Sequence, residues 1–127
     1  MILVVDASAV VNALTNPGDR GAEARLMLAE PDLLAPHLID LEVAQGLRRV
    51  GLLRSADMTG ALHRYRSLSI RRFEHLPLLS RIWELRNNLT AYDAAYVALA
   101  EATGAPLVTA DRKLASTPGH RAEAIVV

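Results

Sequence analysis

The chain contains no cysteine among its 127 residues. This absence excludes disulfides, thiolate metal sites and thiol nucleophiles, so any bound metal must be held by oxygen or imidazole ligands. No apolar run reaches the length of a membrane span, and the N-terminus lacks the basic start of a signal peptide. We therefore expect a cytoplasmic protein with no membrane partner.

Neither sign of charge is in excess, because 14 basic residues balance 14 acidic ones. The overall field therefore does not attract nucleic acid as a strongly basic domain would, and any such contact needs a local patch. Thirteen of the basic residues are arginines, which we attribute to codon usage. One local basic stretch, at Arg64, Arg66, Arg71 and Arg72, is either a solvated face or a surface that follows an RNA backbone.

Several common catalytic patterns are also missing. The four histidines have no metal-ligand spacing, and we interpret them as surface or loop residues. The chain has no Gly-rich phosphate loop and no serine in a Gly-x-Ser-x-Gly turn. Histidine metal centres, P-loop chemistry and serine-hydrolase chemistry are therefore disfavoured.

Short apolar runs alternate with helical patterns along the chain. Strands are predicted at 2–5, 32–36, 70–73, 107–109 and 124–127, and helices at 7–14, 22–29, 38–53, 78–86 and 91–103, with a further helix opening at Ser55. The run at 2–5 is the expected central strand, and the helix over 38–53 is apolar on most of its circumference, which is typical of a buried or interface helix. We predict one domain over residues 1–127, with an α/β fold, a three-layer α/β/α sandwich and a mostly parallel sheet of about five strands.

Acidic side chains are predicted to gather where two of these strands end. Thr90 has the pattern of a helix N-cap, which places Asp93 in the first helical turn. The strand that follows this helix delivers Thr109 and Asp111 at its C-terminal end, and Asp6 ends the first strand. Ligands bind at the carboxyl ends of strands in open α/β sheets, so we expect these groups to converge there.

A further acid stands among apolar residues in the helix predicted over 38–53. Glu42 interrupts that apolar run, and a carboxylate buried alone costs several kcal/mol, so it needs a partner. The nearest basic residues, Arg48 and Arg49, follow about two turns later. Asp40 competes with Glu42 for the same role, and a helical wheel does not decide between them.

A divalent cation would satisfy several of these acids at once. Carboxylate oxygens are typical ligands of Mg²⁺ and Mn²⁺, and such an ion supports phosphodiester hydrolysis because it activates water and neutralises phosphate charge. Thr109 would orient a water or a ligand through its hydroxyl. In the alternative interpretation, each of Asp6, Asp93 and Asp111 only caps a helix and binds no metal. Their coincidence at one edge of the sheet favours the metal site.

Four motifs together resemble the PIN-domain ribonucleases, and more narrowly the VapC toxins of toxin–antitoxin pairs. They are the segments 4–9, 38–44, 89–100 and 107–114. The likeness spans nearly the full length and implies a PIN-like fold and a Mg²⁺- or Mn²⁺-dependent endoribonuclease. The acids that it implies are Asp6, Glu42, Asp93 and Asp111, so it selects Glu42 over Asp40. Thr109 matches the hydroxyl position of the family before the last acid, and Ser8 matches a small polar position after the first.

The resemblance also implies partners. VapC toxins form homodimers, cut structured RNAs such as tRNA or rRNA, and are held inactive by a VapB antitoxin whose C-terminal segment reaches into the acidic groove. The alternative that stays open is a non-catalytic module whose acidic groove binds an Arg-containing peptide. A receiver domain needs an aspartate where Phe73-Glu-His stands, and a haloacid-dehalogenase-like phosphatase needs one at Ser8, so we set both aside.

Overall fold

A central parallel sheet organises the chain. The computed structural model describes residues 1–127. Its strands are β1 (Ile2–Val5), β2 (Asp32–Pro36), β3 (Ile70–Phe73), β4 (Leu107–Thr109) and β5 (Ala124–Val126). They lie in the order β3-β2-β1-β4-β5, and every neighbouring pair is parallel. The predicted five-stranded sheet with the first strand at its centre is therefore confirmed.

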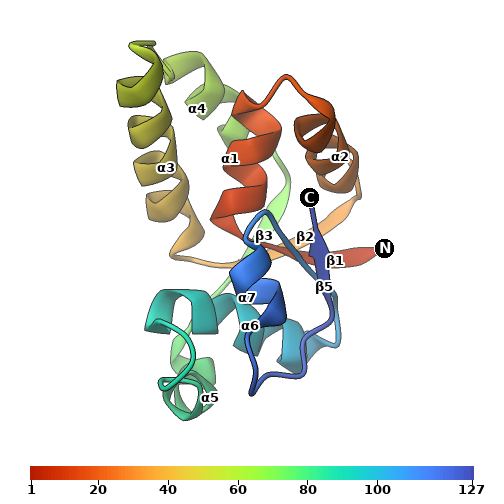
Figure 1. Cartoon of the computed structure of the whole chain (residues 1–127). Coiled ribbons are helices and arrows are strands. Elements are labelled where there is room, and N and C mark those ends of the chain that lie inside the picture. Colours follow the sequence, from red (N-terminus) through yellow and green to blue (C-terminus); the bar gives the residue numbers. More distant parts are fainter.

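Helices cover both faces of this sheet. They are α1 (Ala7–Thr15), α2 (Asp19–Leu28), α3 (Ile39–Arg54), α4 (Thr59–Arg66), α5 (Leu79–Glu84), α6 (Ala91–Thr103) and α7 (Arg112–Ser116), with a short 3-10 helix at Leu76–Leu78. In Figure 1 the helices α1 to α4 stand on one side of the strands, and α5 and α6 stand on the other. The predicted three-layer α/β/α sandwich is confirmed. None of the helices combines the length and the apolar composition needed to span a lipid bilayer.

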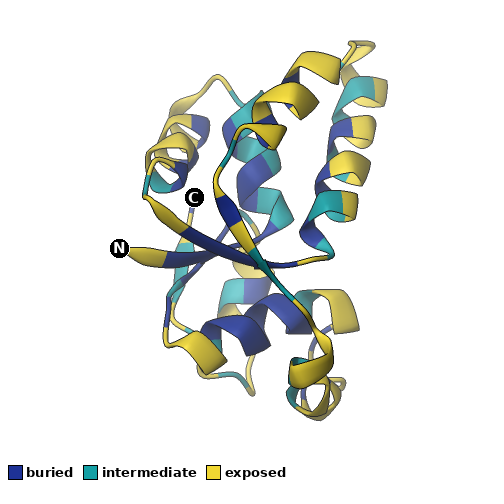
Figure 2. Cartoon of the chain, turned by 180° about the vertical axis from the view of Figure 1, so that it is seen from behind, coloured by how far each residue is buried: buried dark blue, intermediate teal, exposed yellow.

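The hydrophobic core lies on both sides of β1 and along α6. Leu3, Val4 and Val5 of β1 are completely buried, and every residue of α6 from Ala94 to Ala100 is buried. Figure 2 shows this buried band through the strands and along the helix packed against them. Five of the seven buried α6 positions from 94 to 100 are small or β-branched, which lets the helix axis lie close to the sheet. The start of α6, and with it Asp93, is therefore held firmly against the core.

The order of the strands creates a crevice next to β1. From β1 the chain runs outward through β2 to β3, and it then crosses back to β4 on the other side of β1. The segments that follow β1 and β4 therefore diverge, and this is the point at which open α/β sheets bind ligands. Asp6 directly follows β1 and Asp111 closely follows β4, so both border this crevice.

Four of the predicted helices differ from the structure, and the one predicted over 22–29 begins three residues earlier, at Asp19. Ser55 does not open a helix, because it adopts the left-handed conformation that ends α3, and α4 begins at Thr59, where Asp57 accepts a hydrogen bond from the Thr59 amide. The helix predicted over 78–86 is divided between the 3-10 turn and a shorter α5. Helix α3 buries only one face, since Leu41, Leu52 and Leu53 are 67–80% exposed; it is therefore not a buried helix, and its role at an interface stays a prediction.

The basic stretch noted in the sequence is dispersed by the fold. Arg72 pairs with Asp40 (Nη2 to Oδ1, 2.7 Å), Arg71 stacks on the ring of Phe73, and Arg64 donates to the carbonyl of Leu14. That last bond belongs to a set in which guanidinium groups from α2, α3 and α4 satisfy the final carbonyls of α1. Its members are Arg25 on Ala13 and Asn16, Arg54 on Thr15, and Arg64 on Leu14. Most of this stretch therefore stabilises helix ends and packing.

Candidate active site

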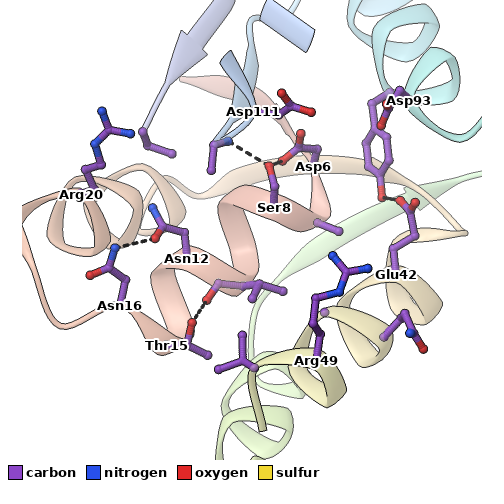
Figure 3. A pocket seen from close by; sticks show the side chains of 18 of the residues that line it. Asp6, Ser8, Asn12, Thr15, Asn16, Arg20, Glu42, Arg49, Asp93 and Asp111 are labelled. Atoms are coloured by element: carbon purple, nitrogen blue, oxygen red, sulfur yellow. Dashed lines mark hydrogen bonds between the residues drawn. The ribbon is translucent and has the colours of Figure 1, made fainter. Parts of the chain in front are cut away.

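All four predicted acids line one groove of about 660 Å³ at the carboxyl end of the sheet, where Figure 3 shows their side chains. They come from four different places in the chain: the end of β1, the first turns of α3 and α6, and the loop after β4. The acids are Asp6, Glu42, Asp93 and Asp111. The fold therefore brings together the residues that the sequence could place only at the ends of separate elements.

Asp6 is the most rigidly held of these acids. Its Oδ1 accepts hydrogen bonds from the hydroxyl of Ser8 (2.7 Å) and the amide of Ala9 (2.9 Å), and its Oδ2 accepts one from the hydroxyl of Thr109. The Ala9 bond also makes Asp6 the N-cap of α1, so its predicted capping role is confirmed, and its role as a metal ligand stays a prediction. Only 5% of Asp6 is exposed, and burial raises its pKa from 3.8 to about 6 despite these donors.

Two hydroxyl groups join the end of β1 to the end of β4. Thr109 is completely buried, donates to Asp6, and accepts a hydrogen bond from the amide of Asp111 (3.0 Å). Ser8 donates to Asp6 and accepts from the amide of Ala110 (2.9 Å). Thr109 therefore positions Asp6 in this structure, and its hydroxyl is occupied by protein atoms. Its role in orienting a water or a ligand stays a prediction.

The structure separates Glu42 from its competitor Asp40. Glu42 faces the groove, where its Oε1 accepts a hydrogen bond of 2.6 Å from the hydroxyl of Tyr96. Asp40 lies outside the groove and is held by Arg72 and by the hydroxyl of Tyr65 (2.6 Å). The Arg72 guanidinium holds the pKa of Asp40 below its usual value, whereas burial raises the pKa of Glu42. Asp40 thus fastens α3 to its neighbours, and Glu42 is the one of the two acids that lines the groove.

Tyr96 is a site residue that the sequence analysis missed. Tyr96 is 1% exposed. Its pKa is raised mainly by burial and also by the hydrogen bond to Glu42, so its hydroxyl remains protonated and donates. The only sequence signal was its position three residues after Asp93, which puts both side chains on the same face of α6. A tyrosine among apolar residues in the sequence is usually a core residue. The spacing of Tyr96 from Asp93 therefore did not identify Glu42 as its partner.

Asp93 is at the centre of the electrostatic coupling. It occupies the first turn of α6, where its amide donates to the Thr90 hydroxyl (3.2 Å) and confirms the predicted N-cap. Burial raises the pKa of Asp93, and repulsion from Asp111 raises it further. The charge of Asp93 in turn contributes to the raised pKa values of Asp6 and Glu42. The four acids therefore act on one another as one group of like charges.

No cationic side chain neutralises this group. The four ion pairs of the structure use Glu30, Asp40, Glu84 and Glu101 instead. No three carboxylate or imidazole groups lie close enough to form a ready-made metal cage. The donors nevertheless suit Mg²⁺ or Mn²⁺, because they are all oxygens and because Mg²⁺ usually binds one or two carboxylates directly and keeps several waters. An ion of this kind would relieve the mutual repulsion.

Asp6 is expected to make the protein less stable as the pH rises through about 6 in the presence of a chelator. The folded state keeps the Asp6 proton up to its pKa of about 6, whereas the unfolded state releases it near 3.8. The stabilisation from Asp6 is therefore complete below pH 3.8 and is lost as the pH rises through 6. Thermal unfolding in EDTA should show a loss of up to about 3 kcal/mol over this window in the wild type relative to Asp6→Asn. Parallel pH curves for the two proteins would contradict this assignment.

Proteins of similar sequence identify the family of this chain. The sequence matches the PIN domain family over residues 3–119. It is 49% identical over 119 residues to ribonuclease VapC9 of Mycobacterium tuberculosis, covering 91% of both chains. It is 44% identical over 120 residues to ribonuclease VapC1 of the same organism, covering 91% of this chain and 90% of the relative.

Solved structures have the same fold. The structure of PAE2754 from Pyrobaculum aerophilum superposes with a TM-score of 0.71 at 28% identity, over 96% of this chain and 90% of the other. VapBC2 of Rickettsia felis, solved bound to a promoter DNA fragment, gives a TM-score of 0.67 at 17% identity, over 98% of both chains, which shows the shared fold. With the family match over residues 3–119, these similarities establish that the chain belongs to the PIN-domain family, among the VapC ribonucleases.

Proposed function

We propose that this chain cleaves RNA with a divalent ion, Mg²⁺ or Mn²⁺, held by Asp6, Glu42, Asp93 and Asp111. Its place among the VapC ribonucleases makes it a toxin-type endoribonuclease, and the proposal concerns the metal and its ligands. The observation that carries it is the convergence of four carboxylates in one groove without a single ion-pair partner. Carboxylates that gather without a positively charged partner favour the binding of a cation.

The surrounding residues set the orientation of these ligands. The hydroxyls of Ser8 and Thr109 fix both oxygens of Asp6, and the Tyr96 hydroxyl fixes one oxygen of Glu42. Such outer hydrogen bonds keep ligating oxygens in place and preserve their charge. When bound, the ion supplies Lewis-acid chemistry, in which it lowers the pKa of water and neutralises charge on the phosphate. Asp111 lines the groove as an exposed residue, and the cap of α7 uses only one of its two carboxylate oxygens.

We further infer that the chain acts in the cytoplasm on RNA of the tRNA or rRNA class, as a homodimer controlled by a VapB-type antitoxin. The VapC relatives and the fold shared with the VapBC2 protein support the antitoxin. Exposed leucines on α3 support an interface with a second chain or with the antitoxin, because large exposed apolar side chains are typical of interaction sites. These leucines are Leu41, Leu52 and Leu53.

The alternative is a non-catalytic role in which the groove binds an Arg-containing peptide. The same unpaired carboxylates support it, because a guanidinium forms strong charge-assisted hydrogen bonds with them. Such a role would need neither a metal nor RNA. The two functions therefore differ in what a chelator does.

The test is cleavage of purified cellular RNA by the isolated protein with Mg²⁺ or Mn²⁺, compared with the same reaction in EDTA. We expect discrete products with metal, no products in EDTA, and recovery when excess Mg²⁺ is added back, because the ion supplies both water activation and phosphate neutralisation. Circular dichroism in EDTA is the control that the chain remains folded. Cleavage that continues in EDTA, or its absence from all RNA pools and metals, would overturn the metal-dependent mechanism.

A further inference from the structure

The groove that holds the four acids changes character along its length. Beyond the acids it continues between α1 and α3, where most of its polar side chains are amides and guanidinium groups, beside the apolar Val11 and Val50. The amides and guanidinium groups belong to Asn12, Asn16, Arg20, Gln45, Arg49 and Arg54. Only six of the 19 residues that line the whole groove are hydrophobic. The lining thus combines a carboxylate end with an end rich in hydrogen-bond donors.

Arg49 is directed toward the acidic end. Glu42, Gln45 and Arg49 are spaced by three and four residues on α3, so they lie on one face of that helix. In Figure 3 the guanidinium of Arg49 extends from α3 into the groove, toward Glu42 and Ser8. Arg49 takes no part in any ion pair or hydrogen bond of the structure, whereas Arg54, also on α3, donates to the Thr15 carbonyl. Its five donors are therefore free.

Helices α1 and α3 pack closely in the part of the groove between Glu42 and Arg49. Gly46 lies on the same face between them and lines the groove. A Cβ at this position would approach Cγ2 of Val11 on α1 to 2.8 Å, so a side chain there would press against α1. The glycine therefore lets α1 pack closely on α3 through Val11, which fixes the position of Arg49 relative to α1.

We propose that Arg49 binds a backbone phosphate of the RNA substrate next to the phosphate that is cut. This inference rests on the proposed function, in which the scissile phosphate meets the acids. Seven residues of helix place Arg49 about 10 Å from Glu42 along the axis of α3, so the two positions serve different parts of the strand. A guanidinium matches phosphate oxygens in a bidentate manner, and Gln45 and Asn12 are side chains of the kind that commonly contact the backbone beside it.

The polar lining favours RNA over a protein ligand at this end. A partner helix in a groove is usually anchored by several apolar side chains in apolar pockets. A nucleic-acid backbone is held mainly by arginine, amide and hydroxyl groups, which are the groups present here. The arginine also offsets the repulsion that the four acids exert on an approaching phosphate.

The test compares Arg49→Ala with Arg48→Ala, its neighbour on α3, which is also exposed but does not line the groove. Both variants lose one positive charge. Binding of a short labelled single-stranded RNA of mixed sequence is measured in an Asp93→Asn background with Mg²⁺, over a series of salt concentrations. We expect Arg49→Ala to weaken binding about tenfold and Arg48→Ala to leave it nearly unchanged. The slope of log Kd against log salt should fall by about 0.7 for Arg49→Ala only, because one phosphate contact is lost.

Two further measurements separate this role from others. Arg49→Lys keeps the charge but not the planar fork, and it should restore the salt slope with only part of the affinity. Equal thermal unfolding midpoints for Arg49→Ala and Arg48→Ala would exclude a merely structural effect. The phosphate site is refuted if both alanine variants weaken RNA binding equally, or if neither does. This holds even when the wild type shows Mg²⁺-dependent cleavage. A carboxylate-bearing protein then becomes the expected ligand of Arg49. Failure of the proposed function would instead appear as the lack of metal-dependent cleavage by the wild type.

Discussion

Replacement of Asp93 by asparagine is expected to lower metal-dependent RNA cleavage by about a thousandfold or more. The change removes the charge that couples to the three other acids, while it preserves the shape of the side chain. The loss of several kcal/mol of transition-state stabilisation corresponds to a rate decrease of this size. The measurement is the initial rate of cleavage of purified cellular RNA at saturating Mg²⁺ or Mn²⁺, with the wild type in parallel.

The same substitution should not destabilise the fold in the absence of metal. Burial and repulsion from Asp111 both raise the pKa of Asp93, so its charge is unfavourable in the folded state. We therefore expect an unchanged or higher thermal unfolding midpoint in EDTA, as is common where a site trades stability for function. The control is Asp32→Asn, which removes an exposed charge at the opposite, N-terminal end of a strand and should retain activity. Full activity of Asp93→Asn would refute the role of the acidic cluster in catalysis.

Substitution of Gly21 by alanine should cause the largest loss of stability from a single methyl group. Gly21 is buried in α2, and a Cβ there would lie 1.8 Å from the carbonyl oxygen of Asn16 and 2.7 Å from its carbonyl carbon. These are backbone atoms at the end of α1, so α2 must move away from α1 to relieve the clash. Overpacking of this kind costs about 3 kcal/mol, which corresponds to a fall of about 10 °C in the unfolding midpoint.

Gly60→Ala is the matched control for this prediction. Gly60 also lies in a helix, α4, but a Cβ there would meet only the side chain of Arg64, at 3.6 Å. Alanine has a helix propensity up to about 1 kcal/mol better than glycine, so this variant should unfold at the same or a higher temperature. Thermal denaturation followed by circular dichroism measures both. Similar midpoints for the two variants would show that the approach of α2 to α1 is not as tight as the structure indicates.

Much of the architecture was predictable because its signals are local. The apolar runs at 2–5 and 107–109 each end in an acidic segment, and their alternation with helices requires parallel crossovers. Helix ends were less predictable. Ser55 was expected to start a helix because serine is a common N-cap, but the preceding helix continues to Arg54 and uses Ser55 to end in a left-handed turn. Local preference does not show which of two adjacent helices will claim a polar residue.

The acidic site was also predictable only in part. The sequence determined by itself that Asp6, Asp93 and Asp111 stand at element ends, and family resemblance then selected Glu42 over Asp40. Only the tertiary structure supplies the physical reason for that choice: Asp40 is held by Tyr65 and Arg72, 25 and 32 residues away, and Glu42 by Tyr96, 54 residues away. It also decided that, of the two α3 arginines whose donors are free, Arg49 lines the groove and Arg48 does not. Periodicity along one segment fixes which face a side chain occupies, but the partner on that face comes from packing between distant segments, and it is this packing that determines charge, orientation and access in the groove.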